Sequence, residues 1–108
     1  MRTAITSSGN SLQSTIDERF GRCAWFVIYD TDSGSIEFLP NSAKSADEGA
    51  GLAAVEILAG KNVDMIVSGE YGFKIKSVLE SLNIQMVILK QPERTIEEII
   101  ELINQKGK

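Results

Sequence analysis

The stretch GAGLAAVEILAGKNVDMIVSG, residues 49–69, decides the fold of this chain. Residues 49–62 are rich in Ala, Leu, Ile and Val on several faces and close with Gly60, which predicts a well-buried helix opened by glycines. Residues 63–69 form an apolar run that ends in small residues, which predicts a strand. A helix that leads directly into a strand of this kind is typical of a parallel sheet covered by helices.

The alternation of helix and strand continues toward the C-terminus. A second helix with apolar residues at helical spacing ends at Asn83, and a last strand is predicted over residues 84–89. The TIEE sequence from Thr95 is a capping box, which predicts the start of a third helix. The expected core positions of these two helices are Ile75, Val78, Leu79 and Leu82, then Ile96, Ile99, Ile100 and Ile103.

The N-terminal part of the chain predicts three strands. Residues 1–6 form a short strand, and residues 24–29, AWFVIY, are too continuously apolar for a surface strand, so we expect burial on both faces. The turn sequence DTDSG, residues 30–34, joins this strand to IEFL from Ile36 in an antiparallel hairpin. The whole order predicts an α/β fold: one domain over residues 1–108, with a mixed five-stranded sheet, an antiparallel meander followed by strand–helix alternation, and helices on both faces.

Composition narrows the function. The chain has 108 residues, a net charge of −4 and a single cysteine, and it has no histidine. Nucleic-acid binding needs a basic face, which an acidic chain lacks, so we expect no nucleic-acid partner. No apolar run suits a signal peptide or a membrane span, so we expect a cytoplasmic protein that does not bind a membrane. Histidine-based catalysis and the usual zinc or non-haem iron ligand sets cannot come from one such chain. Catalytic triads that depend on histidine are therefore excluded.

Three glycine-bearing segments are expected to meet beyond the carboxyl ends of the parallel strands, where ligands bind in such sheets. They are the serine-rich loop of residues 7–15 with DERFGRC at 17–23, EGAG at 48–51, and SGEYG at 68–72. Free N–H groups at helix starts favour an anion, and the cations Arg19, Arg22 and Lys74 would add positive charge. The alternatives are that the glycines mark only tight turns and that the serine loop is merely solvated.

Cys23 has two interpretations. Free cysteine is among the most buried residue types and often packs as a small hydrophobic side chain. Two nearby arginines would instead favour the thiolate, which is the form that binds metals. Both interpretations stay open at the level of the sequence.

The stretches RFGRCAWFVIYD, residues 19–30, and GAGLAAVEILAGKNVDMIVSGEYGFKIKSVLESLNIQMV, residues 49–87, resemble the dinitrogenase iron–molybdenum cofactor biosynthesis family. The resemblance covers nearly the whole chain and implies a ribonuclease H-like three-layer α/β/α fold. It also implies a nitrogenase-accessory-like role in binding, carrying or assembling an anionic iron–sulfur or molybdenum–sulfur cluster rather than catalysis. On this resemblance we expect no catalytic residues and a protein that is not an enzyme. The cluster-binding residues that it implies are Arg19, Phe20, Gly21, Arg22, Cys23, Gly49, Gly51, Gly69 and Gly72, with Cys23 as the metal ligand.

The chain departs from the family pattern because some relatives use histidine or additional cysteines. An electrostatic cradle of arginines and N–H groups is one way to hold a cluster here, and a homodimer that shares two Cys23 thiolates is another. The partners implied are cluster-assembly or cluster-receiving proteins, including an ATPase, with the chain as a monomer or homodimer. Two alternative functions stay open: a small-anion or nucleotide-phosphate binding module, and a regulatory or scaffold protein for a cluster-assembly partner.

Overall fold

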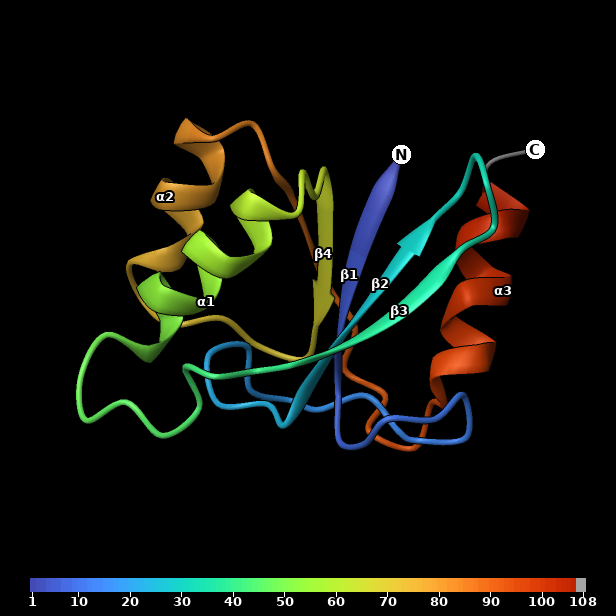
Figure 1. Cartoon of the computed structure of the whole chain (residues 1–108), viewed down its shortest axis with the longest axis horizontal. Coiled ribbons are helices and arrows are strands. Elements are labelled where there is room, and N and C mark those ends of the chain that lie inside the picture. Colours follow the sequence, from blue (N-terminus) through green and yellow to red (C-terminus); the bar gives the residue numbers. More distant parts are fainter. Residues whose placement is uncertain (107–108) are drawn as a thin grey trace.

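The computed structural model describes residues 1–106, and its elements follow the predicted order (Figure 1). The strands are β1 (Arg2–Ser7), β2 (Trp25–Asp30), β3 (Ile36–Pro40), β4 (Met65–Ser68) and β5 (Gln85–Ile88). The helices are α1 (Ala50–Gly60), α2 (Ile75–Ser81) and α3 (Ile96–Lys106). The α/β class is therefore confirmed. None of the helices in residues 1–106 is long and apolar enough to cross a membrane.

The five strands form one mixed sheet in the order β3-β2-β1-β4-β5. β2 runs antiparallel to both of its neighbours, β1 and β3, whereas β4 runs parallel to β1 and to β5. The predicted meander followed by strand–helix alternation is confirmed. Because β1 lies in the centre, Ile5 pairs with Val27 on one side and with Val67 on the other.

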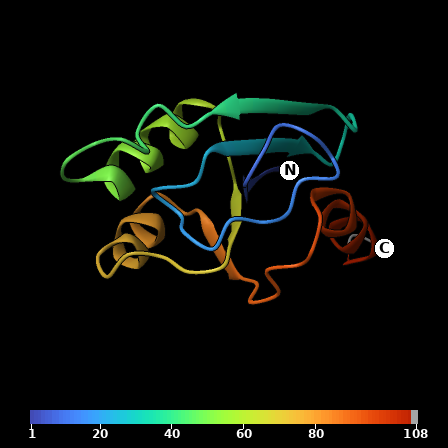
Figure 2. The same cartoon turned by 90° about the horizontal axis from the view of Figure 1, so that it is seen from below.

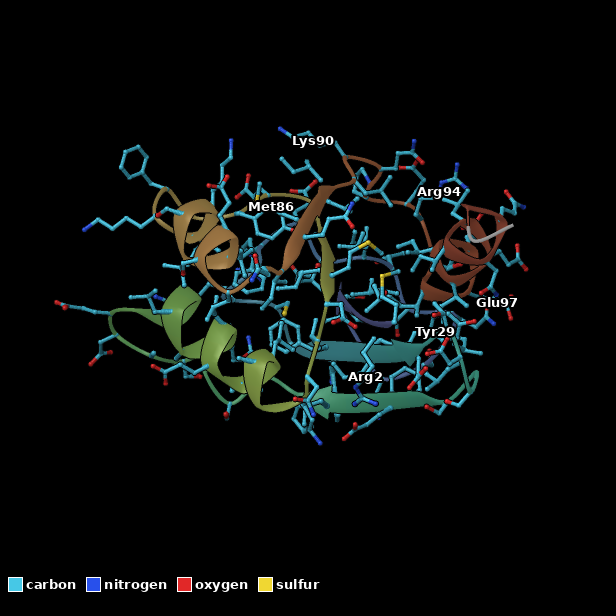
Figure 3. The ribbon with its side chains drawn as sticks, turned by 90° about the horizontal axis from the view of Figure 1, so that it is seen from above. Arg2, Tyr29, Met86, Lys90, Arg94 and Glu97 are labelled. Atoms are coloured by element: carbon cyan, nitrogen blue, oxygen red, sulfur yellow. The ribbon has the colours of Figure 1, made fainter. Side chains whose placement is uncertain are left out.

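Helices cover both faces of the sheet, as Figure 2 shows from below. Alternate residues of β1 point to opposite faces, so that Ala4 packs in the core under α1 and α2 while Ile5 packs in the core under α3. β2 is buried on both faces, as the sequence predicts. Near the C-terminus, the Tyr29 hydroxyl donates a hydrogen bond of 2.6 Å to Asn104 Oδ1, and Figure 3 shows Tyr29 between the sheet and α3. The three layers follow from this alternation.

The start of α3 forms the predicted capping box. The Glu98 N–H donates to Thr95 Oγ1 at 3.2 Å, and the Thr95 N–H donates to Glu98 Oε1 at 3.0 Å. The Thr95 hydroxyl also donates to Glu98 Oε1, at 3.2 Å, and the two bonds that Thr95 donates to this carboxylate are the main reason that the pKa of Glu98 lies below its ordinary value of 4.5. The four isoleucines predicted to face the core, Ile96, Ile99, Ile100 and Ile103, are all buried.

Some element boundaries differ from the predicted ones. β4 begins at Met65 rather than at residue 63, and α2 ends at Ser81. The helical spacing places Leu82 in the core, but this side chain is 47% exposed because it lies beyond the last helical residue. The chain then turns at Asn83, whose φ of 58° is in the left-handed region. The apolar spacing therefore extends one residue past the point where α2 ends.

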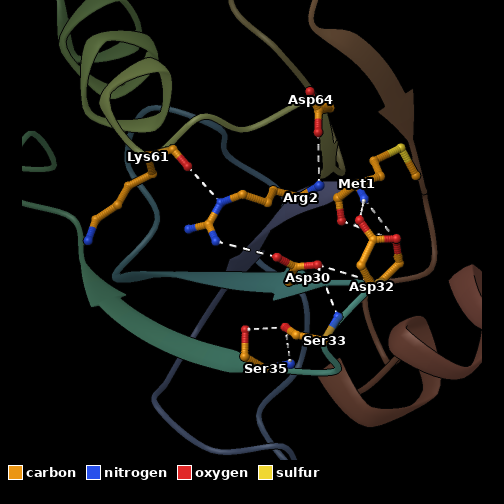
Figure 4. A network of polar contacts seen from close by, with 9 residues as sticks. Met1, Arg2, Asp30, Asp32, Ser33, Ser35, Lys61 and Asp64 are labelled. Atoms are coloured by element: carbon orange, nitrogen blue, oxygen red, sulfur yellow. Dashed lines mark hydrogen bonds and ion pairs between the residues drawn. The ribbon is translucent and has the colours of Figure 1, made fainter.

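The opposite end of the sheet from the helix starts is held by a polar network around the N-terminus (Figure 4). Arg2 Nε donates to the Lys61 carbonyl at 2.8 Å, and the Arg2 N–H donates to the Asp64 carboxylate at 2.9 Å. The Met1 ammonium lies 3.1 Å from Asp32. Main-chain hydrogen bonds in the turn, more than the nearby cations, hold the pKa of Asp30 below its ordinary value. In this network each cation is already paired, which suits a structural role.

We expect Thr95→Ala to lower the free energy of unfolding by about 1 kcal/mol, because the first turn of α3 loses the side-chain acceptor for its Glu98 N–H. Urea denaturation measures the change. Ser77→Ala is the control, since Ser77 is an exposed residue within α2 and bonds only the Lys74 carbonyl one turn earlier. Equal stability of Thr95→Ala and wild type would show that the capping box contributes nothing.

Candidate functional site

A groove of about 610 Å³ lies at the end of the sheet where α1 and α2 begin. Figure 1 shows both helix starts at this end. The segment before β2, the start of α1 and the segment between β4 and α2 meet here, and they line the groove. The lining residues are Arg19, Phe20, Gly21, Arg22, Gly49, Ala50, Gly51, Leu52, Glu70, Tyr71, Gly72, Phe73, Lys74 and Ile75.

Close contacts at glycines hold the three segments together. A Cβ on Gly21 would lie 2.8 Å from the Gly51 nitrogen and 3.0 Å from the Ala50 carbonyl carbon. A Cβ on Gly69 would lie 2.7 Å from the Glu18 Cα. Because these neighbours are main-chain atoms, a side chain at either position would push the segments apart. The two glycines therefore bring the walls of the groove into contact.

The N-terminus of α1 opens into the groove without a capping side chain. Gly49 is the N-cap, with a φ of 69°, and it offers no side-chain acceptor. The residues that carry the first N–H groups, Ala50, Gly51 and Leu52, line the groove. The first turn holds no acidic residue that would compete for these donors. The positive end of the helix dipole is thus available to an anion.

The three predicted cations have different environments. The side chain of Arg19 is 62% exposed, and its Nε lies 3.5 Å from Asp17, a surface pairing of small energetic value. Lys74 is exposed at the start of α2. Arg22 donates to the carbonyl oxygens of Lys44 and Ala46, so part of its guanidinium holds the loop before α1. Arg19 and Lys74 are consequently the cations with most freedom to meet a ligand.

Aromatic residues support and border the groove. The Tyr71 hydroxyl lies 2.8 Å from the carbonyl oxygens of Ile66 and Val87, and burial raises its pKa above the ordinary value. The rings of Tyr71 and Phe20 lie 5.4 Å apart. These two rings are anchored in the fold, whereas the neighbouring Phe73 side chain is 99% exposed.

Cys23 lies in the core and does not line the groove. It is 0% exposed, and its thiol donates to the Phe20 carbonyl at 3.4 Å. Burial, with a smaller contribution from the charge of Asp17, raises the pKa of the thiol from 9.0 to about 12. The arginines, which the sequence suggests would activate it, are not among the causes of the shift. The structure supports the packing interpretation of Cys23, because a buried neutral thiol is a poor metal ligand.

Most of the predicted site residues come together. Arg19, Phe20, Gly21, Arg22, Gly49, Gly51 and Gly72 line the groove, whereas Gly69 and Cys23 lie outside it. The sequence predicts that the serine loop, residues 7–15, meets the other glycine-bearing segments at the site, and this prediction is wrong because none of these residues lines the groove. The loop's carbonyl groups at Leu12 and Ser14 accept hydrogen bonds from the first N–H groups of α3, which ties the loop to the other face of the sheet.

Sequence reasoning missed Asn41, Leu52 and Phe73. Asn41 is 2% exposed, and its amide donates to the carbonyl oxygens of Gly21 at 3.0 Å and Cys23 at 2.9 Å. Its position directly after the last residue of β3 gives no signal of this role. Phe73 does carry a signal, because a large apolar residue stands in a polar, glycine-bearing segment ahead of a helix.

The donor set of the chain bears on which ligands fit. Within residues 1–106, no three His, Cys, Asp or Glu side chains lie together in a way that could hold a metal ion. The groove instead provides N–H groups and cations, with Glu70 as an acidic residue on its lining. Such donors suit the outside of an anion rather than a bare metal ion.

A second groove, of about 590 Å³, lies along α3 and the neighbouring strands. Among residues 1–106 its lining is mostly apolar, includes Met65, Val67, Val87 and Leu102, and has no arginine or lysine. The α-ammonium of Met1 at its edge is paired with Asp32. The described part of this groove therefore lacks the arginine and lysine side chains that line the groove at the start of α1.

The fold and the groove define a small α/β protein in which the start of α1, Arg19 and Lys74 line one groove. The family model described as dinitrogenase iron-molybdenum cofactor matches residues 1–106, and the chain belongs to this family. The resemblance seen in the sequence is confirmed. An uncharacterized protein of Methanocaldococcus jannaschii is 30% identical over 105 residues, which cover 94% of this chain and 84% of that protein.

Solved structures agree with this assignment. The apo form of the orange protein from Desulfovibrio gigas superposes with a TM-score of 0.89 at 26% identity, covering 97% of this chain and 88% of that one. A Thermotoga protein with a provisional NifB designation superposes with a TM-score of 0.81 at 29% identity, covering 96% and 87%.

We expect Gly21→Ala to lower the free energy of unfolding by about 2 kcal/mol, because the added methyl group would overlap main-chain atoms at the start of α1. Gly60→Ala is the matched control, since a Cβ at Gly60 would have no neighbouring atom within 4 Å and the φ of Gly60 is not positive. Chemical denaturation of both variants compares them. A Gly21→Ala protein as stable as Gly60→Ala would contradict the close contact between the segments.

We expect the Cys23 thiol to resist alkylation in the folded protein. With a pKa of about 12, the thiolate is about one part in ten thousand of the folded population at pH 8, and the side chain is buried as well. Iodoacetamide labelling followed by mass spectrometry should show slow modification in buffer and rapid modification in urea. Equal rates in the two conditions would place the thiol at the surface and restore it as a candidate ligand.

Proposed function

We propose that this protein binds an anionic iron–sulfur or molybdenum–sulfur cluster as cargo in the groove at the start of α1, and that it is a carrier or assembly protein rather than an enzyme. The observation that carries the proposal is the convergence of the uncapped α1 N-terminus with Arg19 and Lys74 in one groove. Membership of the iron–molybdenum cofactor family supports the class of cargo. The similar orange protein was solved in an apo form.

The donor set supports holding without covalent ligation. A cluster that arrives with its own sulfide ligands has a negatively charged surface, and it needs hydrogen-bond donors and cations more than metal ligands. The groove supplies both from α1, the RFGR segment and the start of α2. Cys23 is buried behind the groove lining, so the proposal does not require its thiolate.

Delivery is the second part of the proposal. Exposed cations and N–H groups bind through several weak contacts, so cargo can leave without the breaking of a metal–protein bond. Cluster-assembly or cluster-receiving proteins, including an ATPase, are the partners that fit such a role. A shared site in a homodimer is a further arrangement, in which the second chain would cover the exposed side of the cargo.

Small-anion binding is a second candidate function, because the same N–H groups and cations would accept phosphate. The groove lacks the phosphate-binding sequence of nucleotide proteins, since GAG at residues 49–51 has neither the dinucleotide fingerprint nor a Walker lysine. A comparison of ligands separates the two functions.

Tetrathiomolybdate, added without oxygen, is expected to raise the melting temperature and to bind in a calorimetric titration, because a ligand of the folded state stabilises it. Lys74→Ala and Arg19→Ala should each weaken binding by up to roughly fivefold, as expected for one exposed charge. Binding should also weaken as the salt concentration rises.

Lys76→Ala is the matched control for Lys74→Ala. Both lysines are exposed near the start of α2, but Lys76 does not line the groove. If both variants weaken binding equally, the attraction is a general charge effect and the groove is not the site. If the wild-type protein binds phosphate but not tetrathiomolybdate, the small-anion function replaces the cluster function.

A further inference from the structure

Phe73 is a fully exposed aromatic residue on the lining of the groove. Its side chain is 99% exposed, and it stands between Gly72 and Lys74 in the segment that joins β4 to α2. On the α1 side of the groove, Leu52 is 47% exposed. Neither side chain contributes much to the stability of the fold, because an apolar side chain stabilises a protein when it is buried. The apolar surface here therefore calls for an explanation outside the core.

Charged and apolar residues both line this groove. The N–H groups of α1 and the cations Arg19 and Lys74 attract any small anion. Phe73 and Leu52 add apolar surface beside them, which a strongly hydrated oxyanion does not favour because its oxygen atoms would lose water without gaining donors. Sulfur atoms, by contrast, make favourable contacts with aromatic rings.

The segment that carries Phe73 is suited to approach a ligand. A Cβ on Gly72 would meet only Ile75 Cγ1 at an ordinary 3.5 Å, and its φ is not positive. In this respect Gly72 differs from Gly21 and Gly51, whose Cβ atoms would overlap neighbouring atoms. Packing within the fold therefore does not explain why residue 72 is a glycine. Close approach of a bulky ligand beside Phe73 would explain it, because a glycine leaves room for the ligand.

We propose that Phe73, with Leu52, makes the groove selective for anions with a sulfur surface over oxyanions of the same shape and charge. This inference rests on the proposed function and names the residues that set its specificity. Charge and N–H groups supply attraction that the two kinds of anion share. Phe73 and Leu52 supply additional binding affinity that only the sulfur-covered anion gains.

Tetrathiomolybdate and molybdate are the test pair. Both are tetrahedral dianions of molybdenum, but the atoms bound to the metal are sulfur in the first and oxygen in the second. Calorimetric titration of each anion under anaerobic conditions gives the ratio of the two dissociation constants for each protein variant. Wild type should prefer tetrathiomolybdate. Phe73→Ala should weaken tetrathiomolybdate binding roughly twofold to tenfold, the range of a sulfur–aromatic contact, and leave molybdate binding unchanged.

The variants are chosen so that folding does not confuse the result. Phe73→Ala removes a side chain that is 99% exposed, so its melting temperature should equal that of wild type. Leu52→Ala should lower the preference by a smaller factor. Leu82→Ala is its matched control, because Leu82 is also 47% exposed but lies outside the groove.

The outcomes separate this inference from the proposed function. If wild type binds tetrathiomolybdate and Phe73→Ala leaves the ratio unchanged, cargo binding stands and the selectivity of Phe73 is overturned. Equal weakening of both anions by Phe73→Ala also overturns it, because the residue would then shape the groove without distinguishing sulfur from oxygen. If wild type binds neither anion, the proposed function fails and the inference fails with it.

Discussion

The candidate site depends on main-chain contact between the RFGR segment and the start of α1. Gly21 allows the two backbones to meet, because a Cβ at Gly21 would lie 2.8 Å from the Gly51 nitrogen. The second contact, between Gly69 and Glu18, brings the segment after β4 against the same RFGR region. Without these contacts the three segments would stand apart, and the donors on them could not act on one ligand.

The buried polar side chain of Asn41 and the buried thiol of Cys23 stabilise this arrangement. The Asn41 side chain donates to the carbonyl oxygens of Gly21 and Cys23 and accepts from the Ala43 N–H at 3.0 Å, so one buried amide links the RFGR segment to the loop before α1. Buried carbonyl groups need such partners, since an unpaired one is costly. Cys23 suits this place because it is small and its thiol bonds the Phe20 carbonyl. A cysteine that first suggests chemistry thus serves the packing of the site.

Most of the fold could be predicted because the capping box of α3 and the run AWFVIY are patterns that a sequence displays directly. Prediction failed where tertiary contacts decide, as in the serine loop, which supplies acceptors for the first N–H groups of α3. The site was predicted in its residue types but not in their roles. The structure shows that Gly21 contacts another part of the backbone and that Gly72 does not. It also shows that Arg22 is bonded to the loop before α1, whereas Arg19 is not. Each role depends on what approaches the residue from another part of the chain.

The groove carries positive charge in a protein that is acidic overall, and under the proposed function this difference would favour release of the cargo. The chain has a net charge of −4, while Arg19 and Lys74 line one groove with the uncapped end of α1. An anion is therefore attracted only within a short range, since salt screens exposed charges beyond about 10 Å and the rest of the surface repels it. On the proposed function, a site of this kind would hold its cargo by several weak contacts in one orientation. Such contacts can be given up one after another, which suits hand-over to a partner better than permanent retention of a cofactor.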